Sequence, residues 1–272
     1  MIFARDKGRM CNNMLQYAHV YAWGREHGRR TVSMRFCYKY PYFAISSTRG
    51  HNFLTYAAAK LAAGLGLLPV VSFNTPGEDT AAKERLMLSR RNVVVEGWYA
   101  RFYDLFLKYK PDIMRLFAFR PEILNKVSAF AGEAARGCDL RLGLHVRRGD
   151  YKTWHGGQYY YSDAEYAAMA ARFAAISSGR RVCVFVCGND PQLDRNVYLN
   201  GCGAAKVVFA CGNAAEDLCL LSLCDAIIGP PSTFSLVAAM YRDTPLCWAY
   251  DARQDMTPDS FKHFDYLFRH IE

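Results

Sequence analysis

Apolar and polar residues alternate most strictly between Leu140 and Arg147, where every second residue is leucine or valine. A period of two predicts a β-strand. A second arginine, Gly149 and Asp150 follow directly. Ligands of open α/β sheets bind at the carboxyl ends of strands, and a guanidinium matches the oxygens of a phosphate. The stretch therefore predicts an anion site, although arginine pairs are also common on solvated surfaces.

The rest of the chain after this strand repeats a strand-then-helix pattern. Further strands are predicted at Arg181–Cys187, Lys206–Ala210, Ala226–Gly229 and Leu246–Tyr250. Helices are predicted at Asp163–Ile176, Leu193–Tyr198, Ala214–Cys224, Thr233–Tyr241 and Pro258–His270. Asn213 and Glu216 have the spacing of a helix capping box. Such alternation predicts a parallel sheet with helices on both faces.

The N-terminal half begins with a similar unit. A strand at Ile2–Arg5, a polar loop with one glycine, a helix ending near Gly28 and a strand at Thr31–Phe36 form a βαβ unit. A strand is also predicted at Val93–Glu96, and helices at Phe53–Leu65, Ala81–Arg90, Phe102–Lys108, Asp112–Leu116 and from Pro121 to about Ala135. We place a domain boundary near Gly137. The predicted fold is α/β, with two Rossmann-like lobes, residues 1–137 and 138–272, and a cleft between them.

Composition and net charge limit the classes of binding partner that we expect for this chain. The 272 residues are 51% hydrophobic, and 34 Lys+Arg against 25 Asp+Glu give a net charge of +9. This surplus suits nucleic acid, an anionic membrane surface or a phosphorylated substrate. The basic residues are dispersed and no nucleic-acid-binding motif is present, so we expect no nucleic-acid partner. We see no signal peptide and no apolar run of about 18 residues, which favours a cytoplasmic protein.

The ten cysteines contain no C-x-x-C pair. Several fall within apolar strand or helix patterns. We therefore interpret them as small core residues of a reduced cytosolic protein and consider a zinc site improbable.

Residues able to bind an anion follow three of the predicted strands in the second lobe, so they share one rim of the sheet. Ser232 stands at a helix N-terminus, where free N–H groups and the helix dipole favour phosphate, although Ser232 is equally a plain N-cap. The joint hypothesis is a diphosphate held between this helix end and the arginine pair. The three groups are His145, Arg147, Arg148 and Asp150; Asn189 and Asp190; and Ser232, Thr233, Phe234 and Ser235.

These residues carry a family resemblance. The segment 145–150, His-Val-Arg-Arg-Gly-Asp, resembles the H-x-R-R-x-D motif of the α-1,2-fucosyltransferases, glycosyltransferase family 11, which are related to α-1,6- and protein O-fucosyltransferases. Segments 8–17, 96–99 and 217–235 resemble other blocks of that family, in the right order. The resemblance spans residues 1 to about 245.

The family resemblance implies a GT-B-like fold and a GDP-β-L-fucose donor, without an obligatory metal or other cofactor. It implies inverting transfer to a galactoside hydroxyl, in α-1,2 linkage, on a surface glycan or its precursor. The first lobe would then face the acceptor and the second would bind GDP-fucose. The partners would be GDP-fucose and a galactose-containing glycan, with peripheral contact at the inner membrane face. No D-x-D metal motif is present, so arginines would stabilise the leaving diphosphate.

Roles for single residues follow from the resemblance. Arg147 and Arg148 would bind the diphosphate and His145 would shape the site. Asp150 is either the general base or an internal partner of the arginines. The predicted donor-binding residues are Gly8, Asn12, Asn189, Asp190, Asp217, Ser232, Thr233, Phe234 and Ser235.

The chain also departs from the family pattern. Arg9 and Cys11 replace two glycines of the N-terminal loop, and Asn13 replaces a glutamine. Arg9 would be able to reach the diphosphate from the facing lobe. Two alternatives therefore stay open: a transferase for another nucleotide-linked deoxysugar, and an inactive homologue that only binds a sugar nucleotide.

Overall fold

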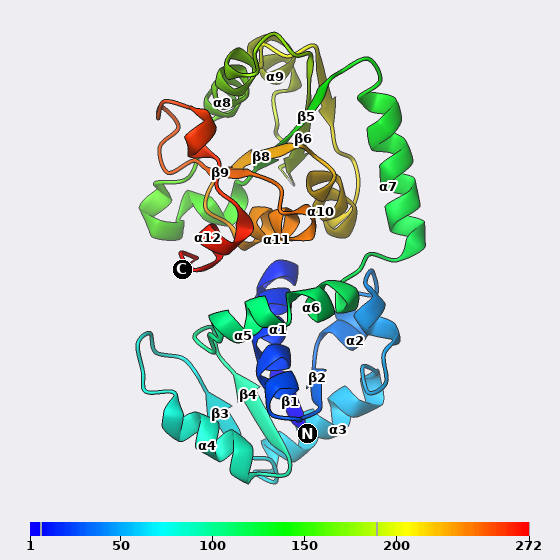
Figure 1. The fold of residues 1–272 in the computed structure, drawn as a ribbon, viewed down its shortest axis with the longest axis vertical. Coiled ribbons are helices and arrows are strands. Elements are labelled where there is room, and N and C mark those ends of the chain that lie inside the picture. The colour runs from blue at the N-terminus through cyan, green and yellow to red at the C-terminus, as the bar shows by residue number, and fades with distance from the viewer. Residues whose placement is uncertain (6, 189, 272) are drawn as a thin grey trace. The chain divides into compact units, whose positions relative to one another are not determined.

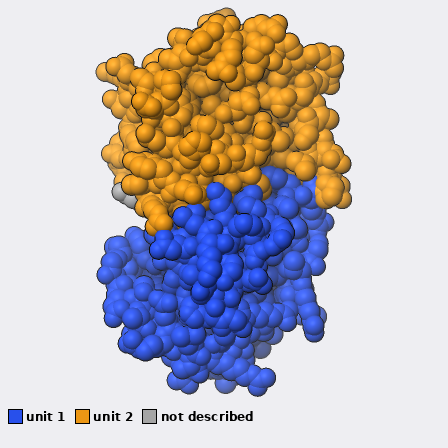
Figure 2. Space-filling model, in the orientation of Figure 1, with its two compact units in different colours: residues 1–120 blue, residues 121–272 orange. Residues whose placement is uncertain are grey.

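The computed structural model of the chain describes residues 1–5, 7–188 and 190–271. It divides into two compact units, residues 1–120 and 121–272 (Figure 2). Each unit contains a parallel sheet accompanied by helices (Figure 1). The predicted α/β class with two Rossmann-like units is thereby confirmed.

The sheet of the first unit has the strand order β2-β1-β4-β3, and all its pairings are parallel. The strands are β1 (Ile2–Arg5), β2 (Thr31–Ser33), β3 (Val70–Ser72) and β4 (Val93–Glu96). The predicted second strand is shorter than Thr31–Phe36, because the Ser33 hydroxyl accepts hydrogen bonds from the backbone N–H of Arg35 and Phe36 and so starts a helix. Strand β3 was not predicted.

Helices cover this sheet. They are α1 (Met10–Glu26), α2 (Phe36–Lys39), α3 (Phe53–Gly64), α4 (Ala81–Ser89), α5 (Tyr103–Lys108) and α6 (Lys110–Leu116), with a 3₁₀ helix η1 (Ala44–Ser47). Helix α3 packs through Ala59 against Phe3, Val32 and Val94. Helix α1 packs on β1 and β2 and against α5.

The sheet of the second unit has the order β7-β6-β5-β8-β9, again all parallel. Its strands are β5 (Leu140–Val146), β6 (Val182–Gly188), β7 (Lys206–Phe209), β8 (Ala226–Gly229) and β9 (Leu246–Trp248). Every strand predicted here is confirmed to within two residues at either end. Strand β5 lies at the centre, so its carboxyl end is flanked by those of β6 and β8.

The helices of this unit are α7 (Pro121–Ala134), α8 (Asp163–Ile176), α9 (Arg195–Gly201), α10 (Ala214–Ser222), α11 (Thr233–Arg242) and α12 (Phe264–Phe268). Short 3₁₀ helices are η2 (Gly149–Lys152), η3 (Trp154–Gly157) and η4 (Pro258–Ser260). The predicted capping box of α10 is present, with Asn213 and Glu216 each bonding the other's backbone N–H.

Two predictions about this part of the chain need correction. Helix α7, predicted in the first lobe, packs against α10, where Lys126 pairs with Glu216, so the unit boundary falls before Pro121 and not near Gly137. The predicted helix Pro258–His270 is interrupted, because Lys262 and Leu246 exchange backbone hydrogen bonds of 2.9 and 3.0 Å and hold the chain extended between η4 and α12.

Within the described ranges, no helix has the length and apolarity that crossing a membrane requires. The cysteines whose side chains the structure describes are free thiols, and most of them are buried, as expected for small core residues. No cluster of three or more His, Cys, Asp or Glu side chains suited to a metal ion occurs among the described residues.

Candidate active site

The structure brings the three anion-binding loops of the second unit to one rim of its sheet. His145 and Phe234 have ring centroids 5.0 Å apart, which joins the end of β5 to the start of α11. Arg148 Nη1 lies 3.2 Å from Asp190 Oδ2, which joins β5 to the loop after β6. Tyr151 donates a hydrogen bond to the carbonyl of Pro231. The predicted convergence of these loops is therefore confirmed, except for Asn189, which lies outside the described residues.

His145 is buried and lines this rim of the sheet. Its side chain is held between Phe234 and β8, where a Cβ on Gly229 would lie 3.0 Å from the His145 Cβ. Burial, and to a smaller degree the charge of Arg147, lowers the pKa of His145 to about 3. The imidazole is thus neutral near pH 7, and its buried Nδ1 has no hydrogen-bond partner in the described part of the chain.

Arg147 is the more available arginine of the motif. Its Nη2 lies 2.9 Å from Asp150 Oδ2, and its guanidinium lies 5.3 Å from the Tyr151 ring centroid. Its buried Nε has no hydrogen-bond partner within the described ranges. Asp150 is 48% exposed and orients Arg147, which favours the second of the two roles predicted for this carboxylate.

Arg148 is held inside the unit by a network of buried groups. Nη2 lies 2.6 Å from Asp163 Oδ1, Nη1 lies 3.2 Å from Asp190 Oδ2, and Nε donates to the carbonyl of Tyr161 at 3.2 Å. Tyr198 donates a second hydrogen bond to Asp163, at 2.7 Å. These contacts join β5, α8, α9 and the loop after β6. Arg148 therefore fixes the shape of the motif loop through its internal partners.

Three hydroxyl residues, Ser232, Thr233 and Ser235, lie at the N-terminus of α11. The Ser232 side chain accepts from the Phe234 backbone N–H at 3.1 Å, which is the predicted N-cap. Ser235 is fully buried, donates to the Ser232 carbonyl and accepts from Trp248 Nε1. The Ser235 hydroxyl thus forms its hydrogen bonds inside the unit, whereas Ser232 and Thr233 lie at the helix end.

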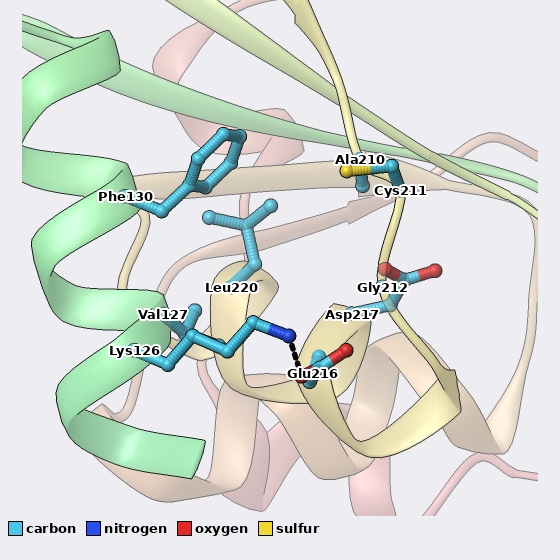
Figure 3. A pocket seen from close by; sticks show the side chains of 9 residues that line it. All are labelled: Lys126, Val127, Phe130, Ala210, Cys211, Gly212, Glu216, Asp217 and Leu220. Carbon is cyan, nitrogen blue, oxygen red and sulfur yellow. Dashed lines mark hydrogen bonds and ion pairs between the residues drawn. The ribbon is translucent and has the colours of Figure 1, made fainter. Parts of the chain in front are cut away.

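Asp217 lines a cavity of about 110 Å³ at the start of α10 (Figure 3). The other lining residues come from α7, α10 and the loop after β7: Lys126, Val127, Phe130, Ala210, Cys211, Gly212, Glu216 and Leu220. Desolvation by burial, helped by the charge of Glu216, raises the pKa of Asp217 to about 7. Among the described residues its carboxylate has no hydrogen-bond or ion-pair partner. A strongly shifted carboxyl beside a cavity is a candidate binding group.

Gly8 and Asn12 belong to the first unit, in the loop from β1 to α1. Gly8 has a φ of +91°, and a Cβ there would lie 2.8 Å from Asn12 Nδ2. The glycine therefore permits the Asn12 amide to rest against the loop. Arg9, at the N-cap of α1, is exposed.

Several residues that shape the site were missed in the sequence. Asp163 was visible only as the first residue of a helix, and Tyr198 only as the apolar end of another. Tyr151 follows the motif but has no distinctive spacing. Their roles come from contacts between segments distant in the chain, which hydrophobic periodicity does not report.

Comparison with known proteins agrees with this geometry. The sequence model of "Glycosyl transferase family 11" matches residues 94–244, which includes the H-x-R-R-x-D segment, Asp217 and the start of α11. The mouse (Mus musculus) protein "Galactoside 2-alpha-L-fucosyltransferase Sec1" is 25% identical over 265 residues, covering 88% of this chain. The chain spans 64% of the length of that relative.

Several solved structures share this fold. An Arabidopsis thaliana FUT1 mutant in complex with GDP has a TM-score of 0.65 at 10% identity, covering 96% of this chain and 73% of that one. Fucosyltransferase NodZ from Bradyrhizobium has a TM-score of 0.56 at 17% identity, covering 91% and 94%. POFUT1 in complex with GDP-fucose has a TM-score of 0.55 at 12% identity, covering 91% and 96%. Because the family model matches more than half of the sequence, this chain belongs to glycosyl transferase family 11.

Proposed function

We propose that this protein is an inverting fucosyltransferase that moves L-fucose from GDP-β-L-fucose to a galactoside hydroxyl, in α-1,2 linkage, on a surface glycan or its precursor. The observation that carries the proposal is the meeting of Arg147, the N-terminus of α11 and the neutral His145 at one sheet rim, in a chain of family 11. The name of the mouse relative supports the galactoside and the linkage. The GDP and GDP-fucose in the related structures support the nucleotide.

The chemistry required of the site is stabilisation of a leaving diphosphate. The acceptor oxygen bonds to the fucose anomeric carbon, the bond to the β-phosphate breaks, and the hydroxyl proton passes to a base. Negative charge grows on the β-phosphate, where a preorganised cation and helix N–H groups stabilise the transition state more than the ground state. We assign this task to Arg147 and to the α11 end around Ser232. Metal independence remains part of the proposal.

Asp217 is our candidate for contact with the base. Guanine presents adjacent N1–H and N2–H donors, which pair with an ionised carboxylate. With a pKa of about 7, Asp217 is mostly protonated at pH 6 and mostly ionised at pH 8. GDP affinity should therefore rise about tenfold between these values. The Asp217→Asn variant should lose this rise in GDP affinity. Any change in affinity caused by titration of the phosphate itself would remain in the variant, so the comparison separates the two effects.

The first experiment is thermal unfolding with GDP, GDP-fucose, UDP and CMP, each with EDTA, on wild type and Arg147→Ala. A ligand at about 100 times its Kd stabilises by about 2.7 kcal/mol. Stabilisation by guanine nucleotides only, lost in Arg147→Ala, supports the donor site. Preference for UDP would favour another nucleotide sugar, and no shift with any nucleotide would contradict the proposal.

Product analysis then addresses the transfer itself. Wild type is incubated with GDP-fucose and a galactoside, and the product linkage is determined by NMR. An α-1,2-linked fucose supports the full proposal. Binding of GDP without turnover on any acceptor would favour the inactive homologue.

We also infer peripheral contact with an anionic membrane through the first unit. Leu61, Leu65 and Leu67, on α3 and just after it, are 65%, 65% and 72% exposed. The Met1 amino group donates a hydrogen bond to the Arg91 carbonyl, and Met1 packs against the same core cluster as Leu68, which follows these leucines. Burial, and then the charges of Arg29 and Arg91, lowers the pKa of this amino group. Exposed leucines beside cations suit a surface of anionic lipids. Sedimentation with phosphatidylglycerol vesicles, lost in Leu61→Gln/Leu67→Gln and absent with phosphatidylcholine, tests this; equal sedimentation of both proteins contradicts it.

A further inference from the structure

Arg101 is a partly buried cation of the first unit whose terminal nitrogens have no hydrogen-bond partner among the described residues. Both terminal amino nitrogens are shielded from solvent, and neither has a hydrogen-bond acceptor in the described part of the chain. No carboxylate there lies within ion-pair distance of it. Burial lowers the pKa of Arg101 to about 10, so the group is still charged near pH 7.

The surroundings of Arg101 are aromatic and neutral. Its guanidinium stacks on Trp98, 3.8 Å from the ring centroid. The nearby His19 is buried and accepts a hydrogen bond at Nδ1 from the Phe102 backbone N–H. Burial, and then the charge of Arg101, lowers the pKa of His19 well below its usual value. The neighbourhood therefore offers Arg101 a ring face, and no carboxylate of the described residues forms an ion pair with it.

The backbone fixes Arg101 at the ligand-binding edge of its sheet. It follows β4, whose Glu96 pairs with Arg5 at the end of β1. Gly97, with a φ of +110°, lets the chain turn against Phe73, where a Cβ would lie 2.1 Å from the carbonyl oxygen. The nearby Glu96 is already engaged by Arg5 and Ser72. Carboxyl edges of parallel sheets are where such folds bind ligands.

A buried charge is stable only when an opposite charge or hydrogen-bond acceptors satisfy it. The described residues supply neither to the terminal nitrogens of Arg101, and the guanidinium stacks on Trp98. We propose that Arg101 anchors an oxyanion-binding site of the first unit, which receives a carboxylate or phosphate group of a substrate. The inference rests on the proposed function and deepens it. The shared chemistry has two sources: the diphosphate of the donor and an acidic sugar of the acceptor.

The test compares wild type with Arg101→Met, which keeps the length of the side chain but not its charge. The probes are inorganic phosphate, glucuronate and GDP, with glucose as the neutral counterpart of glucuronate. Wild type should be stabilised by at least one anion and not by glucose, whereas Arg101→Met should lose that stabilisation. Without ligand, Arg101→Met should have a higher Tm than wild type, because an unpaired buried charge is removed; a purely structural arginine would give a lower Tm.

Two further variants keep the result interpretable. Arg85→Met removes an exposed charge of the same unit and should change neither Tm nor anion response by more than the error. Arg101→Lys keeps a point charge without the planar fork, so it should retain weakened anion binding even if Arg101→Met does not fold.

The source of the anion follows from the GDP titration. A tenfold or larger loss of GDP affinity in Arg101→Met assigns the site to the donor diphosphate. Unchanged GDP affinity with lost glucuronate stabilisation assigns it to an acidic acceptor. Equal responses of wild type and Arg101→Met to all three anions overturn the inference while leaving GDP binding, and with it the proposed function, intact. Absence of GDP binding in wild type contradicts the proposed function, and the phosphate and glucuronate responses still decide the role of Arg101.

Discussion

Substituting Arg148 should destabilise the protein far more than substituting its neighbour Arg147. The Arg148 side chain is 9% exposed and pairs with Asp163 and Asp190, which are 15% and 17% exposed. Arg148→Met leaves both carboxylates without their cation. Removing one member of a buried ion pair costs about 3–5 kcal/mol, because the other charge remains buried.

The magnitude can be bounded from the structure. Asp163 keeps its hydrogen bond from Tyr198, so the lower end of the range, about 3 kcal/mol, is expected for Arg148→Met. In a chain of this size each kcal/mol lowers Tm by about 2–4 °C, which gives about 6–12 °C. Arg147 pairs with Asp150, which is 48% exposed, and such a solvated pair contributes about 0–1 kcal/mol.

Urea unfolding and thermal unfolding of the two single variants, without nucleotide, provide the measurement. GDP titration then completes the comparison, since Arg147→Met should lose nucleotide affinity at nearly wild-type stability. Adding Asp163→Asn to Arg148→Met should cost less than the sum of the single changes, because the two groups interact. Wild-type stability of Arg148→Met together with lost GDP affinity would refute the reasoning, by showing that Arg148 acts on the nucleotide directly.

Three further outcomes are expected. Gly97→Ala should lower the free energy of unfolding by about 3 kcal/mol in urea titration, because its Cβ would meet the Phe73 carbonyl at a φ of +110°. Ser232→Ala removes the cap on the Phe234 N–H and should cost about 1 kcal/mol in the same assay, with weaker GDP binding. Asp217 has a folded pKa raised from 3.8 to about 7, so its cost to stability grows as the pH rises between these values and is constant above them. Asp217→Asn should therefore raise Tm at pH 8 and leave it unchanged at pH 4; equal shifts at both would contradict this.

The sequence predicts this fold best where the side-chain pattern is regular. Alternating residues around Leu142 and the Asn213 capping box gave the central strand and α10 nearly to the residue. The sequence-based prediction failed where local hydrogen bonds ended or interrupted an element. The Ser33 hydroxyl ended β2 by bonding the next N–H groups, and the backbone bridge of Lys262 divided a predicted helix. Strand β3 is short and partly exposed, with Val70 38% exposed, so no buried apolar face marks it in the sequence.

The sequence predicts where the candidate site lies, but not which of its residues contact a ligand and which hold the loops in place. Strand ends in a parallel sheet necessarily share a rim, so His145 and Ser232 could be grouped from the sequence. Two adjacent arginines, in contrast, look equivalent in a sequence. Their difference depends on Asp163, which reaches Arg148 only after α8 has packed on the sheet.

Arg148 and Arg101 show how structural and ligand-binding cations are distinguished. Arg148 and Arg101 have both lost most of their contact with water, and burial costs a guanidinium several kcal/mol in either case. Arg148 recovers this through Asp163, Asp190 and the carbonyl of Tyr161. Among the described residues, Arg101 recovers only a stacking contact with Trp98. Because the fold satisfies the charge of Arg148 and leaves that of Arg101 unsatisfied, Arg101 is the stronger candidate of these two arginines to bind an anion directly.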